Sequence, residues 1–172
     1  EHEPVYTIGK NADYSNLLPT KPSEIKIIKT DRGGDITCHA PGQLIGYLII
    51  DLKRYKKSIT WFMRGIENSI IKMLNEINIK STTKNGLTGV WVNDKKIAAL
   101  GVRLSRWVSM HGFAINVYTD LELFRGIIPC GISDFGLTSI LKIKKKKYNT
   151  IEIAELMAKS MTNMLVESIS NG

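Results

Sequence analysis

The stretch Asp94-Lys95-Lys96-Ile97-Ala98-Ala99-Leu100-Gly101 leads from a turn into an apolar, β-prone segment and places a lysine where that segment begins. Another β-prone run, 89–92, precedes the turn, and a further one, 108–117, follows the segment. Turn-forming residues separate these runs, as in Lys84-Asn85-Gly86 ahead of the first of them. Short strands joined by tight turns pair with their neighbours in the chain. We therefore expect 94–101 to lie inside an antiparallel meander.

The rest of the chain adds further strands and two long helices. Apolar residues recur every three or four positions from Ile59 to Ile77, which predicts a helix over 58–77 with one buried face. A terminal helix is expected from Asn149 or Thr150, with a buried face that runs from Ile153 to Ile169. A short helix is expected from a Ser133 cap through Ile140. The remaining strands are predicted at 5–8, 25–29, 36–38 and 44–52, the last of them buried.

Strands dominate the first 120 residues, and helices follow near the end. This order indicates an α+β fold, a mixed and mostly antiparallel sheet that is flanked by helices. A chain of 172 residues, 43% of them hydrophobic, is expected to form a single domain, here 1–172, that buries about 70% of its unfolded surface.

Composition excludes several classes of function. No apolar run reaches the ~18 residues of a membrane span, and no signal peptide stands at the start. The glycines follow neither the G-x-G-x-x-G nor the Walker pattern, so these nucleotide-binding loops are not indicated. Two distant cysteines, Cys38 and Cys130, suggest neither zinc nor a disulfide scaffold and favour a reducing compartment. The net charge of +8 favours acidic partners.

Lys96 and Cys130 are the candidate catalytic pair. Cys130 stands between a proline and a glycine, where the backbone bends and a thiol can be presented. A neighbouring ammonium lowers the pKa of a thiol, and the thiolate is the nucleophile. Alternation along a strand puts Lys96 on the face of Ala98 and Leu100, opposite Lys95. The alternative is that Lys96 is solvated and Cys130 is an inert buried residue. A single cysteine is more often buried and inert than nucleophilic.

Two histidines, His39 and His111, are placed by turn residues or by glycine, as in His111-Gly112. A structural hydrogen bond is the favoured explanation for each, and a catalytic role is the alternative. No third ligand stands at metal spacing beside them, so no metal site is expected.

Taken in order, the motifs of this chain closely resemble the octanoyltransferases of lipoate biosynthesis. The resemblance runs from Glu1 to about Ile140. It rests on Glu1-His2-x-Pro4-Val5-Tyr6-Thr7-Ile8-Gly9, Arg32-Gly33-Gly34-Asp35-Ile36-Thr37, His39-x-Pro41-Gly42-Gln43-Leu44, Lys96-Ile97-Ala98-Ala99-Leu100-Gly101-Val102-Arg103, His111-Gly112-Phe113-Ala114-Ile115-Asn116-Val117, and Ile128-Pro129-Cys130-Gly131-Ile132 with Thr138-Ser139.

The resemblance implies a biotin and lipoate protein ligase-like fold and an enzyme that moves an octanoyl group from acyl carrier protein to a lysine of a lipoyl domain. Cys130 matches the family's nucleophile, and Lys96 matches the lysine that lowers the thiol pKa and transfers protons. The acyl pocket matches Arg32, Gly33, Gly34, Asp35, Ile36, Thr37, Cys38, His39, Ala99, Leu100, Gly101, Gly112, Phe113 and Ala114.

The implied reaction needs no cofactor, no ATP and no metal, because the donor's phosphopantetheine thioester is already activated. The implied partners are octanoyl-acyl carrier protein and the lipoyl domains of 2-oxoacid dehydrogenase complexes or the glycine cleavage H protein. A monomer is expected, without nucleic acid or membrane. An intracellular location is expected, with a plastid or mitochondrion of an AT-rich eukaryote favoured over bacterial cytoplasm.

The chain departs from the family pattern at two nearby positions, one of them in the expected pocket. Cys38 replaces the usual aromatic residue, and Ala40 replaces a glycine. Cys38 would bring a second thiol into the pocket, where it could compete for the acyl group. The family also carries residues before Glu1, so a chain truncated at its N-terminus is expected.

Three other functions stay open at this point. An ATP-dependent lipoate or biotin protein ligase shares the fold but needs no nucleophilic cysteine. A basic nucleic-acid-binding module would use the lysine run 142–147, although aromatic residues are not interleaved with it as a stacking platform requires. A catalytically inactive scaffold would keep the pocket without the chemistry.

Overall fold

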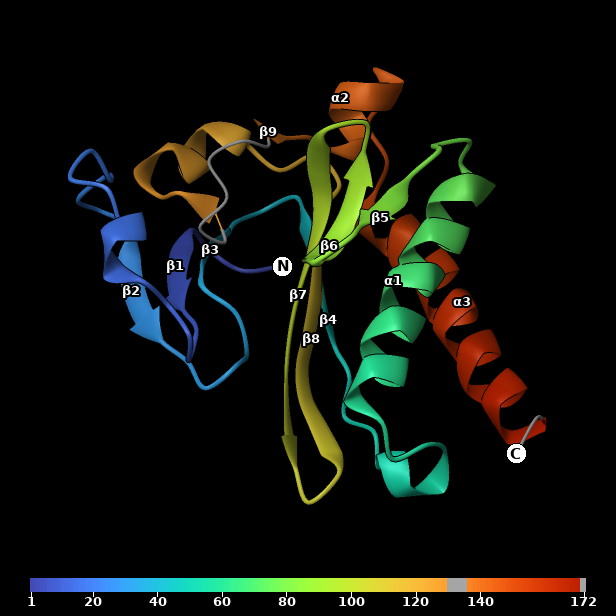
Figure 1. The fold of residues 1–172 in the computed structure, drawn as a ribbon. Coiled ribbons are helices and arrows are strands. Elements are labelled where there is room, and N and C mark those ends of the chain that lie inside the picture. Colours follow the sequence, from blue (N-terminus) through green and yellow to red (C-terminus); the bar gives the residue numbers. More distant parts are fainter. Residues whose placement is uncertain (130–135, 171–172) are drawn as a thin grey trace.

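The computed structural model describes residues 1–129 and 136–170, which form two β-sheets and two long helices (Figure 1). The two helices cover one face of the large sheet, and the small sheet lies on its other side. The predicted α+β class, with mixed and mostly antiparallel sheets flanked by helices, is confirmed. The strands form two separate sheets, whereas the sequence predicts one.

The large sheet contains the predicted meander, in the strand order β4-β8-β7-β6-β5. Its strands are β4 (Gln43–Tyr47), β5 (Thr82–Lys84), β6 (Leu87–Val92), β7 (Lys95–Ser105) and β8 (Val108–Asn116). These neighbours all pair antiparallel, and a sixth strand, β9 (Gly136–Leu137), pairs parallel with the start of β7.

The small sheet has the order β2-β1-β3 and its own apolar core. Its strands are β1 (Val5–Ile8), β2 (Lys26–Lys29) and β3 (Ile36–His39). Tyr6 and Ile36 are fully buried there, against Phe124 of the 3-10 helix η3 (Leu121–Gly126). Two shorter 3-10 helices are η1 (Tyr14–Asn16) and η2 (Leu52–Arg54).

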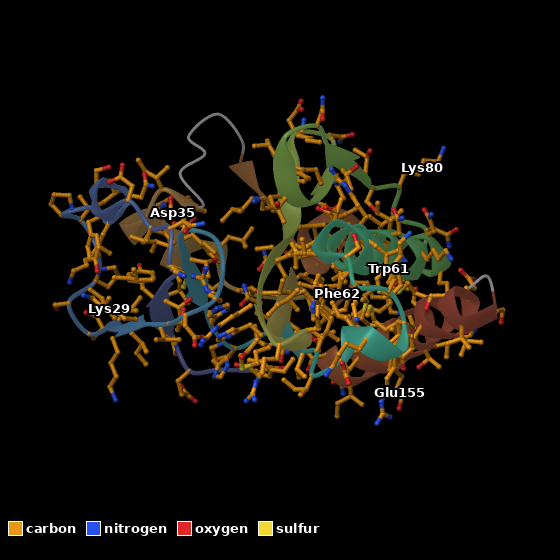
Figure 2. The ribbon with its side chains drawn as sticks, turned by 60° about the horizontal axis from the view of Figure 1, so that its bottom comes forward. Lys29, Asp35, Trp61, Phe62, Lys80 and Glu155 are labelled. Carbon is orange, nitrogen blue, oxygen red and sulfur yellow. The ribbon has the colours of Figure 1, made fainter. Side chains whose placement is uncertain are left out.

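The main core lies between the large sheet and the helices α1 (Ile59–Glu76) and α3 (Thr150–Ser170). The Ser58 side chain caps α1 by accepting from the amide of Trp61, and the helix runs close to the predicted 58–77. At Gly65 a Cβ atom would lie 3.0 Å from Sδ of Met164, so this glycine lets α1 and α3 approach each other. In Figure 2, Phe62 lies in the helix-covered half of the molecule and Asp35 in the small-sheet half.

Several boundaries differ from the prediction. The apolar run 44–52 forms only the short β4, which is half-buried, and Ile49 beyond it is 66% exposed. Both helical stripes are shorter than their pattern, because Ile59 and Ile169, at the ends of the two helices, are exposed. A short helix was predicted from a Ser133 cap through Ile140, and Ser133 lies outside the described residues. The short helix α2 (Ile140–Lys144) begins where the predicted one ends, and Ser139 caps it.

None of the helices among residues 1–129 and 136–170 combines the length and apolar character that crossing a membrane requires.

Candidate functional site

A pocket of about 640 Å³ lies between the two sheets. Its volume falls in the range of small-molecule sites, about 300–1,000 Å³. The small sheet supplies one wall, with side chains from β1, β2 and β3 and from the loop 30–35. Strands β4, β6, β7 and β8 supply the other. The wall residues of the large sheet are Ile45, Gly46, Tyr47, Leu87, Thr88, Lys96, Ala99, Leu100, Gly101, His111, Gly112, Phe113 and Ala114.

Glycines allow the two walls to meet at one end of the pocket. The amide of Gly33 donates to the carbonyl of Val102 at 3.0 Å, which joins the loop 30–35 to β7. A Cβ atom on Gly101 would lie 2.8 Å from the Gly33 carbonyl oxygen and 3.2 Å from Cδ of Arg32. Only a glycine at position 101 therefore permits this contact.

Arg32 stabilises the small-sheet wall of the pocket through hydrogen bonds of its guanidinium group. Its Nη2 donates to the carbonyl oxygen of Thr7 at 2.7 Å and to Oγ1 of the same residue at 2.8 Å. The guanidinium group thus ties the loop to β1 and also lines the pocket.

Lys96 lies at the pocket wall and is only 6% exposed. The β6–β7 ladder explains its direction, since Val90 pairs with Ala98 while Trp91 pairs with Lys96. Ile97 is thus an extra residue, a β-bulge, and a bulge shifts the alternation of side chains by one. The prediction that Lys96 shares a face with Ala98 is wrong, because Ile97 and Ala98 are both buried in the main core. Lys96 instead lines the pocket with Ala99.

The structure brings most of the predicted site residues together. Those that line the pocket are Arg32, Gly34, Asp35, Thr37, His39, Lys96, Ala99, Leu100, Gly101, Gly112, Phe113 and Ala114. Gly33 closes the pocket's end through its backbone, whereas Ile36 and Cys38 are fully buried in the small-sheet core. They are not pocket residues, because alternation along β3 turns them away from Thr37 and His39. Cys130 lies outside the described residues.

Cys38 is not a second pocket thiol. Its side chain is fully buried, and burial raises the pKa of the thiol to about 12. Its Sγ donates to the carbonyl oxygen of His39 at 3.7 Å. A thiol in this state is neutral at physiological pH and shielded from thioesters, so Cys38 does not compete as a nucleophile.

His39 starts a chain of hydrogen bonds that crosses from the small sheet to the large one. Its Nδ1 donates to Oε1 of Gln43 at 2.8 Å, and Nε2 lies 3.3 Å from Oγ1 of Thr7. Nε2 of Gln43 donates to Oδ1 of Asn116 at 2.9 Å, and Nδ2 of Asn116 donates to the carbonyl oxygen of Thr138 at 3.1 Å.

The chain of hydrogen bonds ends at Lys96, since the Thr138 amide donates to the Lys96 carbonyl oxygen at 3.0 Å. Burial lowers the pKa of His39 to about 4, so its ring is neutral near pH 7. The network therefore fixes the backbone of Lys96 with neutral groups only.

His111 belongs to a separate polar cluster in the pocket wall. Its Nε2 lies 2.6 Å from Oδ1 of Asp31, whose other oxygen accepts from Arg103. Burial, reinforced by Arg32 and Arg103, lowers the pKa of His111. Its φ of 62° is unusual for a residue other than glycine inside a strand. The cluster holds the loop 30–35 against β7 and β8.

Sequence reasoning overlooked three residues of this site. Gln43 and Asn116 are buried amides, 2% and 5% exposed, that carry the network between the sheets. Both stand in the quoted family motifs, and a polar residue inside an apolar run was the available signal. Gly89 adopts a φ of 137°, and a Cβ there would lie 2.7 Å from the Ala98 carbonyl oxygen and 3.1 Å from Cε of Lys96. Gly89 thus makes room for the lysine.

No cluster of three or more histidine, cysteine, aspartate or glutamate side chains that could hold a metal ion occurs within 1–129 and 136–170.

Comparison with known proteins finds matches over most of the chain. The family model of the lipoyl protein ligase A/B catalytic domain matches residues 1–162. An octanoyltransferase of Prochlorococcus marinus (strain MIT 9515) is 47% identical over 145 residues, which cover 84% of this chain and 67% of the relative. An octanoyltransferase of Flavobacterium psychrophilum is 46% identical over 174 residues, which cover 95% of this chain and 75% of the relative.

Solved structures share the fold at low sequence identity. A bipartite lipoate protein ligase from Thermoplasma acidophilum superposes with a TM-score of 0.72 at 15% identity, over 96% of this chain and 69% of the other. A biotin protein ligase from Aquifex aeolicus gives a TM-score of 0.61 at 18% identity, over 94% of this chain and 69% of the other.

Proposed function

The chain belongs to the family of the lipoyl protein ligase A/B catalytic domain, and we propose that within it this chain transfers octanoyl groups onto lysines of lipoyl domains. The observation that carries the proposal is Lys96, a nearly buried lysine that lines a largely apolar pocket. The pocket has the size and lining that an aliphatic acyl chain needs. The relatives named octanoyltransferase, at 40% to 48% identity, support the acyl group assigned.

In the first proposed half-reaction, Cys130 takes the acyl group from octanoyl-acyl carrier protein. The thiolate forms a bond to the thioester carbonyl carbon, and the bond from that carbon to the carrier's sulfur breaks. Lys96 supports the thiolate through its charge and gives a proton to the departing phosphopantetheine thiol. One thioester replaces another, so the step changes the free energy little.

In the second half-reaction, the ε-amine of the acceptor lysine attacks the octanoyl-enzyme. An amine with an ordinary pKa of ~10.4 is almost entirely protonated at pH 7, so a base must take its proton. Lys96, left neutral by the first step, is the proposed base. A carbon–nitrogen bond forms, the bond to the Cys130 sulfur breaks, and the thiolate returns beside the Lys96 ammonium. The second proton of the former ammonium group passes to solvent, and the stable amide draws the reaction forward.

An ATP-dependent ligase is the second candidate, because the fold is shared with ligases, one of them solved with bound ATP. The relatives of high identity favour the transferase, and the fold alone does not choose between them. The proposed route consumes no ATP and uses no metal, because the carrier thioester supplies the energy.

The proposed partners are an acidic acyl carrier protein as donor and a lipoyl domain as acceptor. The net charge of +8 would attract both and raise the encounter rate. Lysines of the run 142–147 are exposed or half-exposed, and that run begins on α2, four residues after Thr138 of the Lys96 network. The relatives are bacterial, several of them from Prochlorococcus, which favours bacterial cytoplasm or a plastid as the compartment.

Intact-mass spectrometry tests the proposal. The chain is incubated with octanoyl-acyl carrier protein, without ATP, and then with a lipoyl domain. We expect the enzyme to gain one octanoyl group, to pass it to the lipoyl domain, and to gain none as the Cys130→Ala variant. An adduct that persists in that variant would refute the assigned nucleophile, and transfer that requires ATP would favour the ligase.

A further inference from the structure

We propose that Trp91 is a positioning residue whose indole face holds the ammonium group of Lys96 in the pocket, in place of a carboxylate. The inference deepens the proposed function, since it assigns the group that controls the lysine of the same site.

The contact itself is direct. Nζ of Lys96 lies 4.9 Å from the centroid of the Trp91 ring, within the ~6 Å at which a cation is attracted to an aromatic face. Trp91 is fully buried on β6, and Lys96 is its partner across the ladder to β7. An attraction to a ring is stronger in such a site than at an exposed surface, because water does not compete.

Among residues 1–129 and 136–170, no carboxylate supplies the alternative. Within the described part of the chain, Lys96 takes part in no ion pair, although its side chain is nearly buried. One buried carboxylate, Glu67 of α1, accepts from the amide of Gly89, the residue that packs against Lys96. The other oxygen of Glu67 accepts from Arg64 at 2.7 Å. Both carboxylate oxygens therefore already have partners.

The backbone around the pair is built for this contact. The bulge at Ile97 turns Lys96 toward the pocket, and Gly89 leaves the space that a side chain would otherwise fill. A Cβ on Gly89 would lie 3.1 Å from Cε of Lys96 and 3.2 Å from Cη2 of Trp91. The glycine thus stands where a side chain would crowd both the lysine and the ring.

Burial of Trp91 also carries a cost in folding free energy. Its indole Nε1 is buried without a hydrogen-bond partner among the described residues. An unsatisfied buried donor destabilises a fold, and phenylalanine at this position would avoid that loss. What tryptophan offers beyond phenylalanine is the stronger attraction of its face for a cation.

The contact between Trp91 and Lys96 has a consequence for the electrostatic field that acts on the Cys130 thiol in the proposed mechanism. A carboxylate beside Lys96 would cancel the positive charge that the proposed mechanism uses to lower the thiol pKa of Cys130. An aromatic face stabilises the ammonium, carries no net charge, and accepts no proton. Trp91 therefore keeps the lysine in place while its charge remains effective toward the pocket.

A fluorotryptophan series tests this assignment without changing the shape of the side chain. Trp61 and Trp107 are first replaced by phenylalanine, so that 5-fluoro-, difluoro- and trifluorotryptophan enter only at position 91. Each fluorine weakens the negative potential of the ring face. Two readouts are followed against pH: the ¹³Cε resonance of Lys96, assigned with Lys96→Arg, and alkylation of Cys130 by iodoacetamide.

With each added fluorine, we expect the midpoint of the Lys96 titration to move to lower pH and the alkylation profile to move to higher pH. Complete loss of the aromatic face, in Trp91→Leu, should slow alkylation at pH 7 by up to about tenfold, with Trp91→Phe in between. A structural role alone predicts no dependence on fluorine number. The matched control is the Trp91→Phe/Trp107→Phe variant, in which only Trp61 carries fluorine. In this variant the midpoint of the Lys96 titration should not depend on the number of fluorine atoms.

A fluorine series without any trend would overturn the inference, even if the octanoyl adduct forms on Cys130. A graded Lys96 titration without any octanoyl adduct would instead retain the Trp91 contact and reject the proposed function.

Discussion

Nδ1 of His39 donates to Oε1 of Gln43 at 2.8 Å, across the turn that joins the small sheet to the large one. The Gln43 oxygen can only accept, so Nδ1 carries the proton, and Nε2 of the neutral ring is left to accept from Thr7. The ring is thus held between one acceptor and one donor. A second proton on the ring has no acceptor of its own in this arrangement.

This arrangement predicts a stability that falls in acid. Burial lowers the pKa of His39 from 6.5 to about 4, so the stabilisation by the neutral ring is complete above pH 6.5 and is lost as the pH falls toward 4. The loss is up to roughly 3 kcal/mol. Urea unfolding at pH 7.5 and pH 4 should show this extra loss in the wild type and not in His39→Gln. The same pH dependence in both proteins would contradict it.

Cys38 should be chemically silent in the native protein. In the Cys130→Ala variant, Ellman's reagent should find no reactive thiol in buffer and one in denaturant, because Cys38 is fully buried and its thiol pKa is raised to about 12. Cys38→Ala should keep octanoyl transfer and lose about 1 kcal/mol of stability. Rapid labelling of native Cys38 would show that the small-sheet core opens.

Substitution of Gly101 should damage the pocket more than the fold at large. In Gly101→Ala the new methyl group meets the Gly33 carbonyl and Cδ of Arg32, which displaces the loop 30–35. We expect a loss of about 1–3 kcal/mol in unfolding free energy and a raised KM for the octanoyl donor. Gly136→Ala is the control, because its nearest neighbour, Cγ of Lys95, lies at 3.5 Å. Equal effects of the two substitutions would argue against a close contact at Gly101.

Lys96→Met should separate stability from catalysis. Methionine has a similar length and carries no charge to desolvate, so the unfolding free energy should stay within about 1 kcal/mol of the wild type or rise. Octanoyl transfer should fall at least about a hundredfold, because the acid and base of both half-reactions is lost. The exposed neighbour offers a matched control, since Lys95→Met should leave both quantities unchanged. Transfer at a normal rate by Lys96→Met would exclude the assigned role.

Charge reversal in the lysine run 142–147 should impair the use of octanoyl-acyl carrier protein and not the use of a small octanoyl donor. Lys145→Glu, Lys146→Glu and Lys147→Glu together should raise KM for octanoyl-acyl carrier protein and reduce its dependence on salt. Octanoyl-pantetheine, which lacks the acidic protein, should be used as by the wild type. The control is Lys56→Glu/Lys57→Glu, on the exposed segment ahead of α1. An unchanged KM for the carrier protein would place its docking surface elsewhere.

The fold class and most elements follow from the sequence, because the patterns involved are local. The cap at Ser58 and the stripe through Phe62 and Ile66 determine α1, and turn residues separate the meander strands. Two sheets in place of one could not be foreseen, since strand pairing depends on contacts that are remote in sequence. The prediction of a buried strand over 44–52 was wrong for a related reason, because the apolar side chains of this run partly face the pocket and solvent.

The sequence indicated most of the residues that line the pocket, but not the contacts that depend on how the strands pair. Lys96 and His39 line one pocket, as the motifs imply. Cys38 was misplaced, because a motif does not state which face of β3 a residue occupies. The roles of Gln43, Asn116 and Gly89 depend on the register between strands, which the sequence does not state.

The bulge at Ile97 makes the location of Lys96 depend on the number of residues in β7 as well as on their identity. A deletion of Ile97 would leave every residue of the site in the chain and restore regular pairing with β6. It would also rotate Lys96 out of the pocket wall, and the proposed acid and base would be lost although every residue assigned to the site remains. Homologues that keep every assigned site residue but differ by one residue between Lys96 and Ala98 therefore need a functional assay before an activity is assigned to them.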